Sequence, residues 1–270
     1  MYDLIEQKLE PIQTREEKLH CLREFLQVVI LRIMYETNQF QFMAFVGGTC
    51  LRLLYHMRRF SEDLDFSLIE RQYRVDPFVH SLEMHLKKMG FIVELKIKSE
   101  KNMNNTLVKF SKVLQDFTLS SHPNHKLNIR IEIDTNPPVG WNREISLLSD
   151  DFIFPITHHD LPSLFATKLH ALLFRKYHKG RDYYDIMWYL SKRIVPNFPL
   201  LNNAIEQTQR SKSNVTRENF ISLLTTHFDS VDFDTMRRDV APFIMDRNEL
   251  DLIEKDVFKS LLEKYELEGL

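Results

Sequence analysis

The sequence predicts an α+β domain, in which helices flank a mixed or antiparallel sheet, followed by a helical bundle. From about residue 40 to residue 155, short apolar runs alternate with polar positions at the period of two that half-buried strands show, and amphipathic helical segments separate them. Beyond residue 155 the pattern changes to helical segments alone. We therefore expect two domains, at residues 1–155 and 156–270.

The composition is that of an ordinary globular protein. The 270 residues are 43% hydrophobic and 27% charged, with a formal net charge of -2, which excludes a disordered or collagen-like chain. Two cysteines, Cys21 and Cys50, are too few for a disulfide framework or a zinc cluster. The charged first residues do not fit a signal peptide, and no run of about 18 apolar residues occurs. We expect a cytoplasmic protein that does not enter a membrane.

The first domain is expected to contain three helices and five strands. Thr14 and Glu17 form a capping-box signature before apolar residues at helical spacing. A glycine pair ends the first apolar run, and the Asp76-Pro77 pair supplies a cap and a first-turn proline for a later helix. The expected helices cover residues 14–37, 49–57 and 76–90, and the expected strands cover residues 42–46, 63–68, 91–97, 106–114 and 127–134.

The second domain is expected to be helical. Asn136, Pro137 and Pro138 break the last strand, and Asp160 with Pro162 opens a helix. Further helical segments are expected at residues 181–193, 216–227 and 248–267.

Two glycines and a hydroxyl stand between the first strand and its helix. Glycine lets a phosphate approach the backbone closely, and the amides and dipole of a helix N-terminus favour an anion. Gly47, Gly48 and Thr49 are therefore candidates for holding nucleotide phosphates. A tight turn with no ligand is the alternative interpretation of the same residues.

Acidic residues on two strands are candidates for metal ligands. Asp63 and Asp65 share one side of their strand, and paired carboxylates are the ligands that Mg²⁺ takes beside nucleotide phosphates. A solvated strand face would show the same alternation. Either Glu132 or Asp134 could add a third carboxylate. Asp134 is preferred because it ends its strand, and Glu132 is then left to pair with Arg130.

Cations without acids mark the start of the helical half. The segment from residue 161 to residue 181 contains no Asp or Glu and five cations, Lys168, Arg175, Lys176, Lys179 and Arg181. Such a cluster can hold triphosphate oxygens or an RNA backbone. Lys168 stands out because apolar residues surround it in the sequence, although a lysine stem lying along apolar surface would look the same. Asp182 and Asp185 lie one helical turn apart and serve either catalysis or capping and ion pairing.

These motifs together resemble the nucleotidyltransferase superfamily with the polymerase-β-like fold. More closely, GGTCLRLLYHMRRFSEDLDFSL and KLHALLFRKYHKGRDYYDIMWYL resemble the AbiEii/AbiGii toxin family, the nucleotidyltransferases of type IV toxin–antitoxin systems. The resemblance covers about residues 45 to 190. It implies that residues 1–155 form the nucleotidyltransferase domain, and it implies the following roles. Gly47, Gly48 and Thr49 hold phosphates, Asp63 and Asp65 hold metal, and Lys168 with Asp182 or Asp185 supports activity. Many relatives have serine in the glycine turn, where this chain has Thr49.

We therefore expect a bacterial enzyme that moves NMP from an NTP to an acceptor hydroxyl, with Mg²⁺ or Mn²⁺, in a groove between the two domains. Asp63, Asp65 and Asp134 would hold the metal, and Ser61 would contact a phosphate. The resemblance suggests RNA, such as tRNA, as acceptor and a cognate antitoxin as partner. Nine Lys/Arg against three Asp/Glu between residues 84 and 130 are a second candidate RNA surface. A non-catalytic nucleotide- or RNA-binding module, or a transferase acting on a protein or small molecule, remains open.

Overall fold

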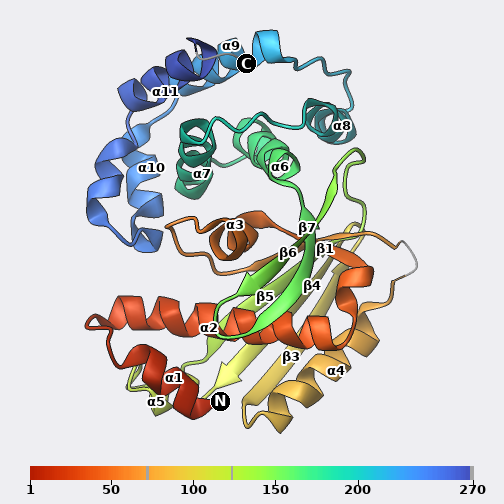
Figure 1. Cartoon of the computed structure of the whole chain (residues 1–270), viewed down its shortest axis with the longest axis vertical. Coiled ribbons are helices and arrows are strands. Elements are labelled where there is room, and N and C mark those ends of the chain that lie inside the picture. Colours follow the sequence, from red (N-terminus) through yellow and green to blue (C-terminus); the bar gives the residue numbers. More distant parts are fainter. Residues whose placement is uncertain (71–72, 123, 268–270) are drawn as a thin grey trace. The chain divides into compact units, whose positions relative to one another are not determined.

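The chain forms two compact units (Figure 1). The structure is a computed structural model, and it describes residues 1–70, 73–122 and 124–267. The first unit consists of Met1–His56, Phe60–Pro137 and Glu144–His158, and the second consists of Met57–Arg59, Pro138–Arg143 and His159–Leu270. Two short segments of the second unit are therefore inserted in the sequence of the first. The predicted fold class, α+β with a helical C-terminal part, is confirmed.

A seven-stranded mixed sheet forms the centre of the first unit, in the order β3-β4-β5-β2-β1-β7-β6 (Figure 1). Strand β2 pairs antiparallel with β1 and parallel with β5, while β1 pairs parallel with β7. The strands are β1 (Met43–Val46), β2 (Leu64–Leu68), β3 (Ile92–Glu100), β4 (Met103–Ser111), β5 (Leu127–Asp134), β6 (Arg143–Ser149) and β7 (Ile153–His159).

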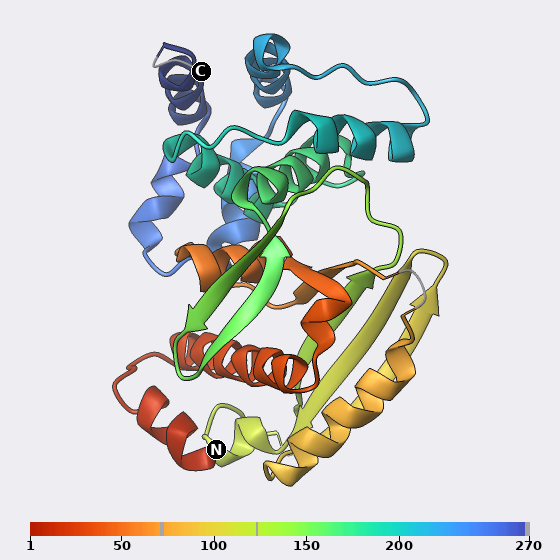
Figure 2. The same cartoon turned by 45° about the vertical axis from the view of Figure 1, so that its right-hand side comes forward.

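The helices of the first unit include the two that pack side by side against the sheet, α2 and α4 (Figure 2). Thr14 caps α2 as predicted, because its hydroxyl oxygen accepts a hydrogen bond from the Glu17 amide at 3.2 Å. Asp76 does not cap α4, which has Arg74 at its N-cap. The helices are α1 (Tyr2–Leu9), α2 (Arg15–Glu36), η1 (Gln39–Gln41), α3 (Gly47–Tyr55), α4 (Val75–Lys88) and α5 (Val113–Asp116).

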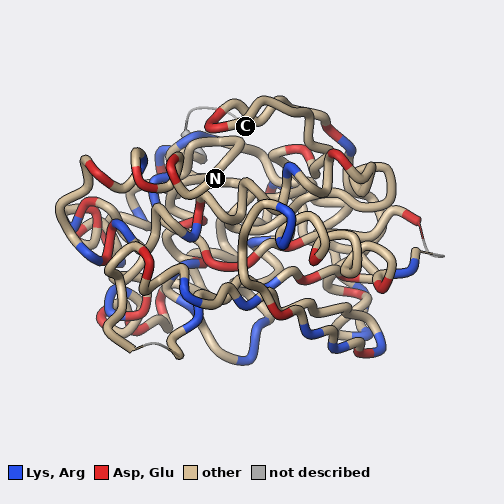
Figure 3. The backbone as a smooth tube through the Cα atoms, turned by 90° about the horizontal axis from the view of Figure 1, so that it is seen from below, with Lys and Arg blue, Asp and Glu red and all other residues tan. Residues whose placement is uncertain are grey.

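The two faces of the sheet differ in chemistry. Along β5 the apolar residues Leu127, Ile129, Ile131 and Ile133 are buried, and the polar residues between them are half-buried or exposed. Asp65 on β2 stands opposite Glu132 on β5, so the two side chains share a face. We call this face of the sheet the polar face. On β3, Lys96 and Lys98 lie between Glu94 and Glu100, and both signs of charge are interspersed along the backbone (Figure 3).

Two parts of the sheet differ from the predicted strands. The strand expected at residues 106–114 ends at Ser111, because Lys112 adopts a left-handed conformation with φ of 65° before α5. Strands β6 and β7 were not predicted, since Pro155 interrupts the apolar run of β7 and the exposed residues of β6 give no clear alternation.

Helices make up most of the second unit. Asp160 caps α6 as predicted and accepts a hydrogen bond from the Ser163 amide at 3.0 Å. The single helix expected at residues 248–267 is instead a 3₁₀ helix followed by α11, and α8 and α10 were not predicted. The helices are α6 (Leu161–Phe174), α7 (Gly180–Ser191), α8 (Phe198–Gln209), α9 (Arg217–Asp229), α10 (Phe233–Val240), η2 (Ala241–Phe243), η3 (Arg247–Leu252) and α11 (Lys255–Leu267).

Among the described residues, no helix combines the length and the apolar character needed to cross a membrane.

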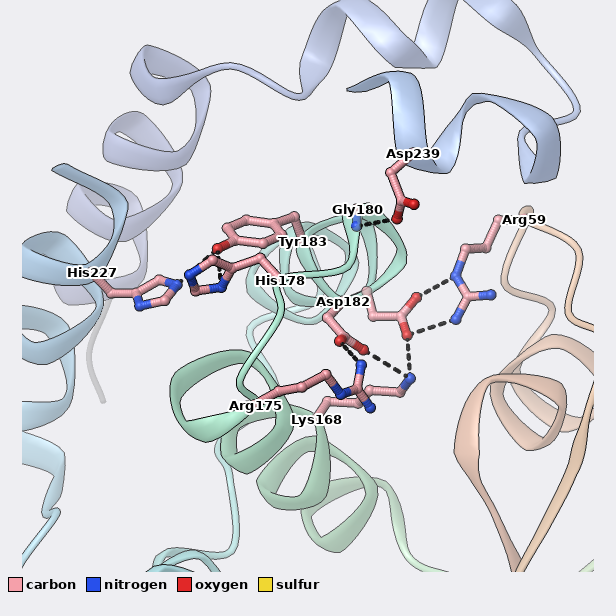
Figure 4. Close-up of polar contacts among 10 residues, drawn as sticks. Arg59, Lys168, Arg175, His178, Gly180, Asp182, Tyr183, His227 and Asp239 are labelled. Atoms are coloured by element: carbon pink, nitrogen blue, oxygen red, sulfur yellow. Dashed lines mark hydrogen bonds and ion pairs between the residues drawn. The ribbon is translucent and has the colours of Figure 1, made fainter. Parts of the chain in front are cut away.

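A buried tyrosine on α7 joins the helices of the second unit. The ring of Tyr183 packs near Phe228 and Phe258, with centroid distances of 6.2 and 6.4 Å. Its hydroxyl lies 3.1 Å from Nδ1 of His178 and 2.9 Å from Nε2 of His227 (Figure 4). Burial, and then the neighbouring His178, lower the pKa of His227 to about 4. The folded chain therefore resists protonation of His227.

We expect the chain to lose stability as the pH falls from about 6.5 to about 4, because the unfolded chain protonates His227 more readily than the folded chain does. His227→Gln should remove part of that loss, measured as Tm against pH. The matched control is His80→Gln at an exposed position of α4. Equal pH profiles for both variants and the wild type would contradict the prediction.

Candidate active site

The predicted glycine turn lies where β1 runs directly into α3. Gly47 has φ of 80°, a conformation that side chains rarely adopt. A Cβ atom added to Gly47 would overlap the carboxylate of Asp65, which stands opposite Val46 on the neighbouring strand. Both the backbone conformation and the lack of space therefore require glycine at this position. Because Gly47 has no side chain, the Asp65 carboxylate can lie against the N-terminus of α3.

Thr49 is buried beneath this turn. Its hydroxyl donates a hydrogen bond to the backbone carbonyl of Asp63. The hydroxyl proton is thus used to fix the start of β2, so this geometry supports a positioning role for Thr49 more than donation to a phosphate.

The residues before Asp63 are fastened to α2 and α3. Gln27, which is buried, donates from Nε2 to the carbonyl of Ser61 at 3.2 Å. The ring of Phe60 stacks on His20 with a centroid distance of 4.3 Å, and the guanidinium of Arg52 lies 4.6 Å from the same ring. These contacts anchor the chain segment that leads into Asp63 and Asp65.

One arginine on the polar face, Arg130, interacts electrostatically with three carboxylates. Arg130 Nη1 lies 3.2 Å from Glu132 Oε1. This hydrogen bond, with the charges of Asp63, Glu132 and Asp65, raises the pKa of Arg130 above its ordinary value. Asp63, Asp65 and Glu132 therefore act on the same guanidinium.

The strand register distinguishes the two candidates for the third carboxylate. Glu132 stands opposite Asp65, whereas Asp134 stands opposite Ser67, one repeat farther along β5. Asp134 accepts a hydrogen bond from the amide of Asn136 at 2.9 Å, and burial raises its pKa. The preference for Asp134 rested on its place at the end of its strand, whereas the parallel register places Glu132 opposite Asp65.

Among the described residues, no group of three His, Cys, Asp or Glu side chains already has the spacing of a metal site. The donors on the polar face are nevertheless of the hard oxygen type that fits Mg²⁺. This ion is commonly held by only one or two carboxylates, with water and substrate phosphates completing its shell.

The second unit contains a buried ionic network that includes Lys168, Asp182 and Asp185 (Figure 4). Nζ of Lys168 lies 2.8 Å from Asp185 and 3.5 Å from Asp182. Asp182 also pairs with Arg175. Arg59 supplies the fourth link, with Nε and Nη2 lying 2.6 and 2.7 Å from the two oxygens of Asp185. Cations and carboxylates therefore alternate from Arg59 to Arg175.

Asp182 and Asp185 have different surroundings. Asp185 is 0% exposed and is engaged at both oxygens. Burial alone would raise the pKa of Asp185, but the charges of Arg59 and Lys168 outweigh it and hold that pKa below its ordinary value. Asp185 is thus an ionised group that orients Lys168. Asp182 pairs instead with Arg175, which is more exposed.

The five cations near α6 do not form one unbroken basic surface. Lys168 and Arg175 pair with the two aspartates of α7, and the guanidinium of Arg181 lies 4.4 Å from the ring of Phe243. The segment with five cations and no acid ends one residue before Asp182, and the ion pairing considered for Asp182 and Asp185 is the arrangement found.

Arg59 is the site residue that sequence reasoning missed. It precedes Asp63 within the same motif, but its partner Asp185 lies 126 residues away. The available signal was a charged residue beside a strand motif, and that signal does not identify a partner so distant in sequence.

We expect Arg59→Met to lower the free energy of unfolding by about 3 to 5 kcal/mol, because it leaves the Asp185 carboxylate buried without its main partner. Arg59→Met/Asp185→Leu should recover much of this loss. Lys87→Met is the control, since it removes an exposed pair with Glu83 that is worth about 0.3 to 0.5 kcal/mol. Urea unfolding measures all three. Equal losses for Arg59→Met and the double variant would contradict the interpretation.

Comparisons with known proteins identify the family and the fold. A family model described as nucleotidyl transferase AbiEii toxin, type IV TA system, matches residues 30–264. The crystal structure of JHP933 from Helicobacter pylori is similar over 90% of this chain and 93% of that chain, with a TM-score of 0.53 and 17% identity. A candidate nucleotidyltransferase from H. pylori is similar over 91% and 97% of the two chains, with a TM-score of 0.55 and 17% identity. No curated protein matches.

At these identities the two crystal structures establish the fold alone, while the family match spans most of the chain. The resemblance inferred from the sequence motifs is confirmed. The chain belongs to the AbiEii family of nucleotidyltransferase toxins of type IV toxin–antitoxin systems.

Proposed function

We propose that this enzyme transfers a nucleoside monophosphate from an NTP to a hydroxyl of RNA, with Mg²⁺ or Mn²⁺ bound at the polar face. One observation carries the proposal. Val46, Asp65 and Glu132 stand opposite one another on three adjacent strands, and Gly47 lies against the Asp65 carboxylate. The N-terminus of α3, which favours an anion, therefore adjoins carboxylates that favour a cation.

Asp65 and Glu132 would hold the metal, and Asp63 would complete the site from the start of β2. Asp134 is not included, because its register position is opposite Ser67. When bound, the metal neutralises phosphate charge and polarises the phosphoryl group under attack.

In the proposed reaction, the acceptor oxygen forms a bond to the α-phosphorus of the NTP. The bond from that phosphorus to the α,β-bridging oxygen breaks, and pyrophosphate leaves with the electron pair. Glu132 takes the proton of the acceptor hydroxyl. The amides at the start of α3 hold the phosphates. Within the second unit, Asp185 keeps the ammonium of Lys168 in place, and the family resemblance supports a role for this charge in activity. The contribution of the protein is thus mainly positioning and charge stabilisation.

RNA is proposed as the acceptor, with tRNA as the first to test. The family supports a toxin that acts in the cell beside an antitoxin, and the surplus of Lys and Arg between residues 84 and 130 supports a polyanionic acceptor.

The direct test is to incubate the purified chain with Mg²⁺, each α-labelled NTP in turn and total bacterial RNA. We expect label to enter RNA with the wild type and not with Asp63→Asn/Asp65→Asn. Label entering a protein or a small molecule would replace RNA as the acceptor. Mg²⁺-dependent NTP binding without transfer to any acceptor would indicate a non-catalytic module instead.

We expect Glu132→Gln to lower kcat/KM by on the order of 100-fold or more, because loss of a ligand weakens charge stabilisation by several kcal/mol. Asp134→Asn, which removes the same charge from the same strand, should cost much less. Initial rates at varied Mg²⁺ concentration compare the two variants, and Glu132→Gln should need more Mg²⁺ for half-maximal activity. A larger loss for Asp134→Asn would restore Asp134 as the third carboxylate.

A further inference from the structure

A groove of about 400 Å³ runs across the polar face from β3 to β5. Its lining includes Lys96 and Lys98 from β3, Asn105 and Leu107 from β4, and Arg130 and Glu132 from β5. The groove therefore ends at the carboxylate that stands opposite Asp65.

The register arranges these residues in two rows that cross the strands. Lys98 stands opposite Asn105, Asn105 opposite Glu132, and Glu132 opposite Asp65. In the next row, Lys96 stands opposite Leu107 and Leu107 opposite Arg130. Since neighbouring strands lie about 4.8 Å apart, Lys98 lies roughly 14 Å from Asp65 across the sheet.

This distance separates the groove from the donor nucleotide. The glycine turn adjoins Asp65 on the β1 side, whereas the groove extends from Asp65 on the β5 side. A triphosphate held at Gly47 and Gly48 lies on the opposite side of Asp65 from the lysines. A small acceptor at Asp65 is likewise too short to reach them, but a nucleotide strand carries phosphates at every residue.

The cations of the groove can exchange their present partners. Lys98 lies 2.7 Å from Glu100, and Lys96 lies 3.1 Å from Glu94. Both pairs are exposed, and water screens such pairs strongly. Arg130 pairs with Glu132, and its guanidinium can pair with a phosphate as well as with a carboxylate. Leu107 adds an apolar position between Lys96 and Arg130 for a sugar or base.

We infer that this groove holds the end of the acceptor RNA strand, with the reacting hydroxyl at Asp65 and Glu132. The phosphates of the preceding nucleotides lie over Arg130, Lys96 and Lys98. The inference rests on the proposed transfer to RNA and adds a direction, since donor and acceptor approach Asp65 from opposite sides along the sheet.

The test uses Lys96→Gln/Lys98→Gln in the full chain, with Lys192→Gln/Lys212→Gln, two exposed lysines of the second unit, as the control of equal charge change. We expect the β3 variant to raise the KM for RNA on the order of 10-fold and to leave the KM for NTP unchanged. RNA binding without NTP should also depend less on salt. In a plot of log binding constant against log salt concentration, the magnitude of the negative slope should decrease by about 0.7 for each lost phosphate contact. The control variant should behave as the wild type in both assays.

The outcomes separate this inference from the proposed function. If the wild type modifies RNA and the β3 variant keeps its KM for RNA and its salt slope, the groove is not the acceptor site. A raised KM for NTP alone would assign the lysines to the donor and would also overturn the inference. If the wild type modifies no RNA, the proposed function fails. The binding assay then still decides whether Lys96 and Lys98 contact RNA.

Discussion

The buried pair between Arg59 and Asp185 is the constraint on which much of the second unit depends. A carboxylate with no exposure is tolerated only when its charge is compensated and both oxygens are hydrogen-bonded. The planar guanidinium meets that need with two parallel bonds, and Lys168 adds the second cation. The same pair fixes the segment Met57–Arg59 within the helical unit and sets the position of the Lys168 ammonium.

The sheet of the first unit obeys a different constraint, because its chemistry depends on strand order. Placing β2 between β1 and β5 gives Asp65 a glycine turn on one side and a carboxylate on the other. The glycine turn is separated from Asp65 in sequence by the short helix α3, and the strand that carries Glu132 follows much later in the chain. The mixed sheet therefore brings anion-binding and cation-binding groups together on adjacent strands.

Local patterns predicted the elements whose signals are local. Three local predictions were correct, because each depends on residues within one turn or one strand. They are the cap at Thr14, the alternation from Leu127 to Ile133 and the cap at Asp160. Alternation also predicted which face Glu132 and Asp134 share. It did not predict which of them stands opposite Asp65, since register is set by pairing between strands distant in sequence. Arg59 was not predicted because its partner, Asp185, is also distant in sequence.

The interleaving of the two units restricts how relatives of this chain can exchange parts. Residues 57–59 belong to the helical unit although the strands before and after them belong to the sheet unit. A recombination event after residue 155 would take Asp185 from one parent and Arg59 from the other. The recombined protein would keep the buried pair only where both parents have Arg59 and Asp185. The motif that contains Arg59 and the helix that contains Asp185 are therefore expected to vary together among relatives.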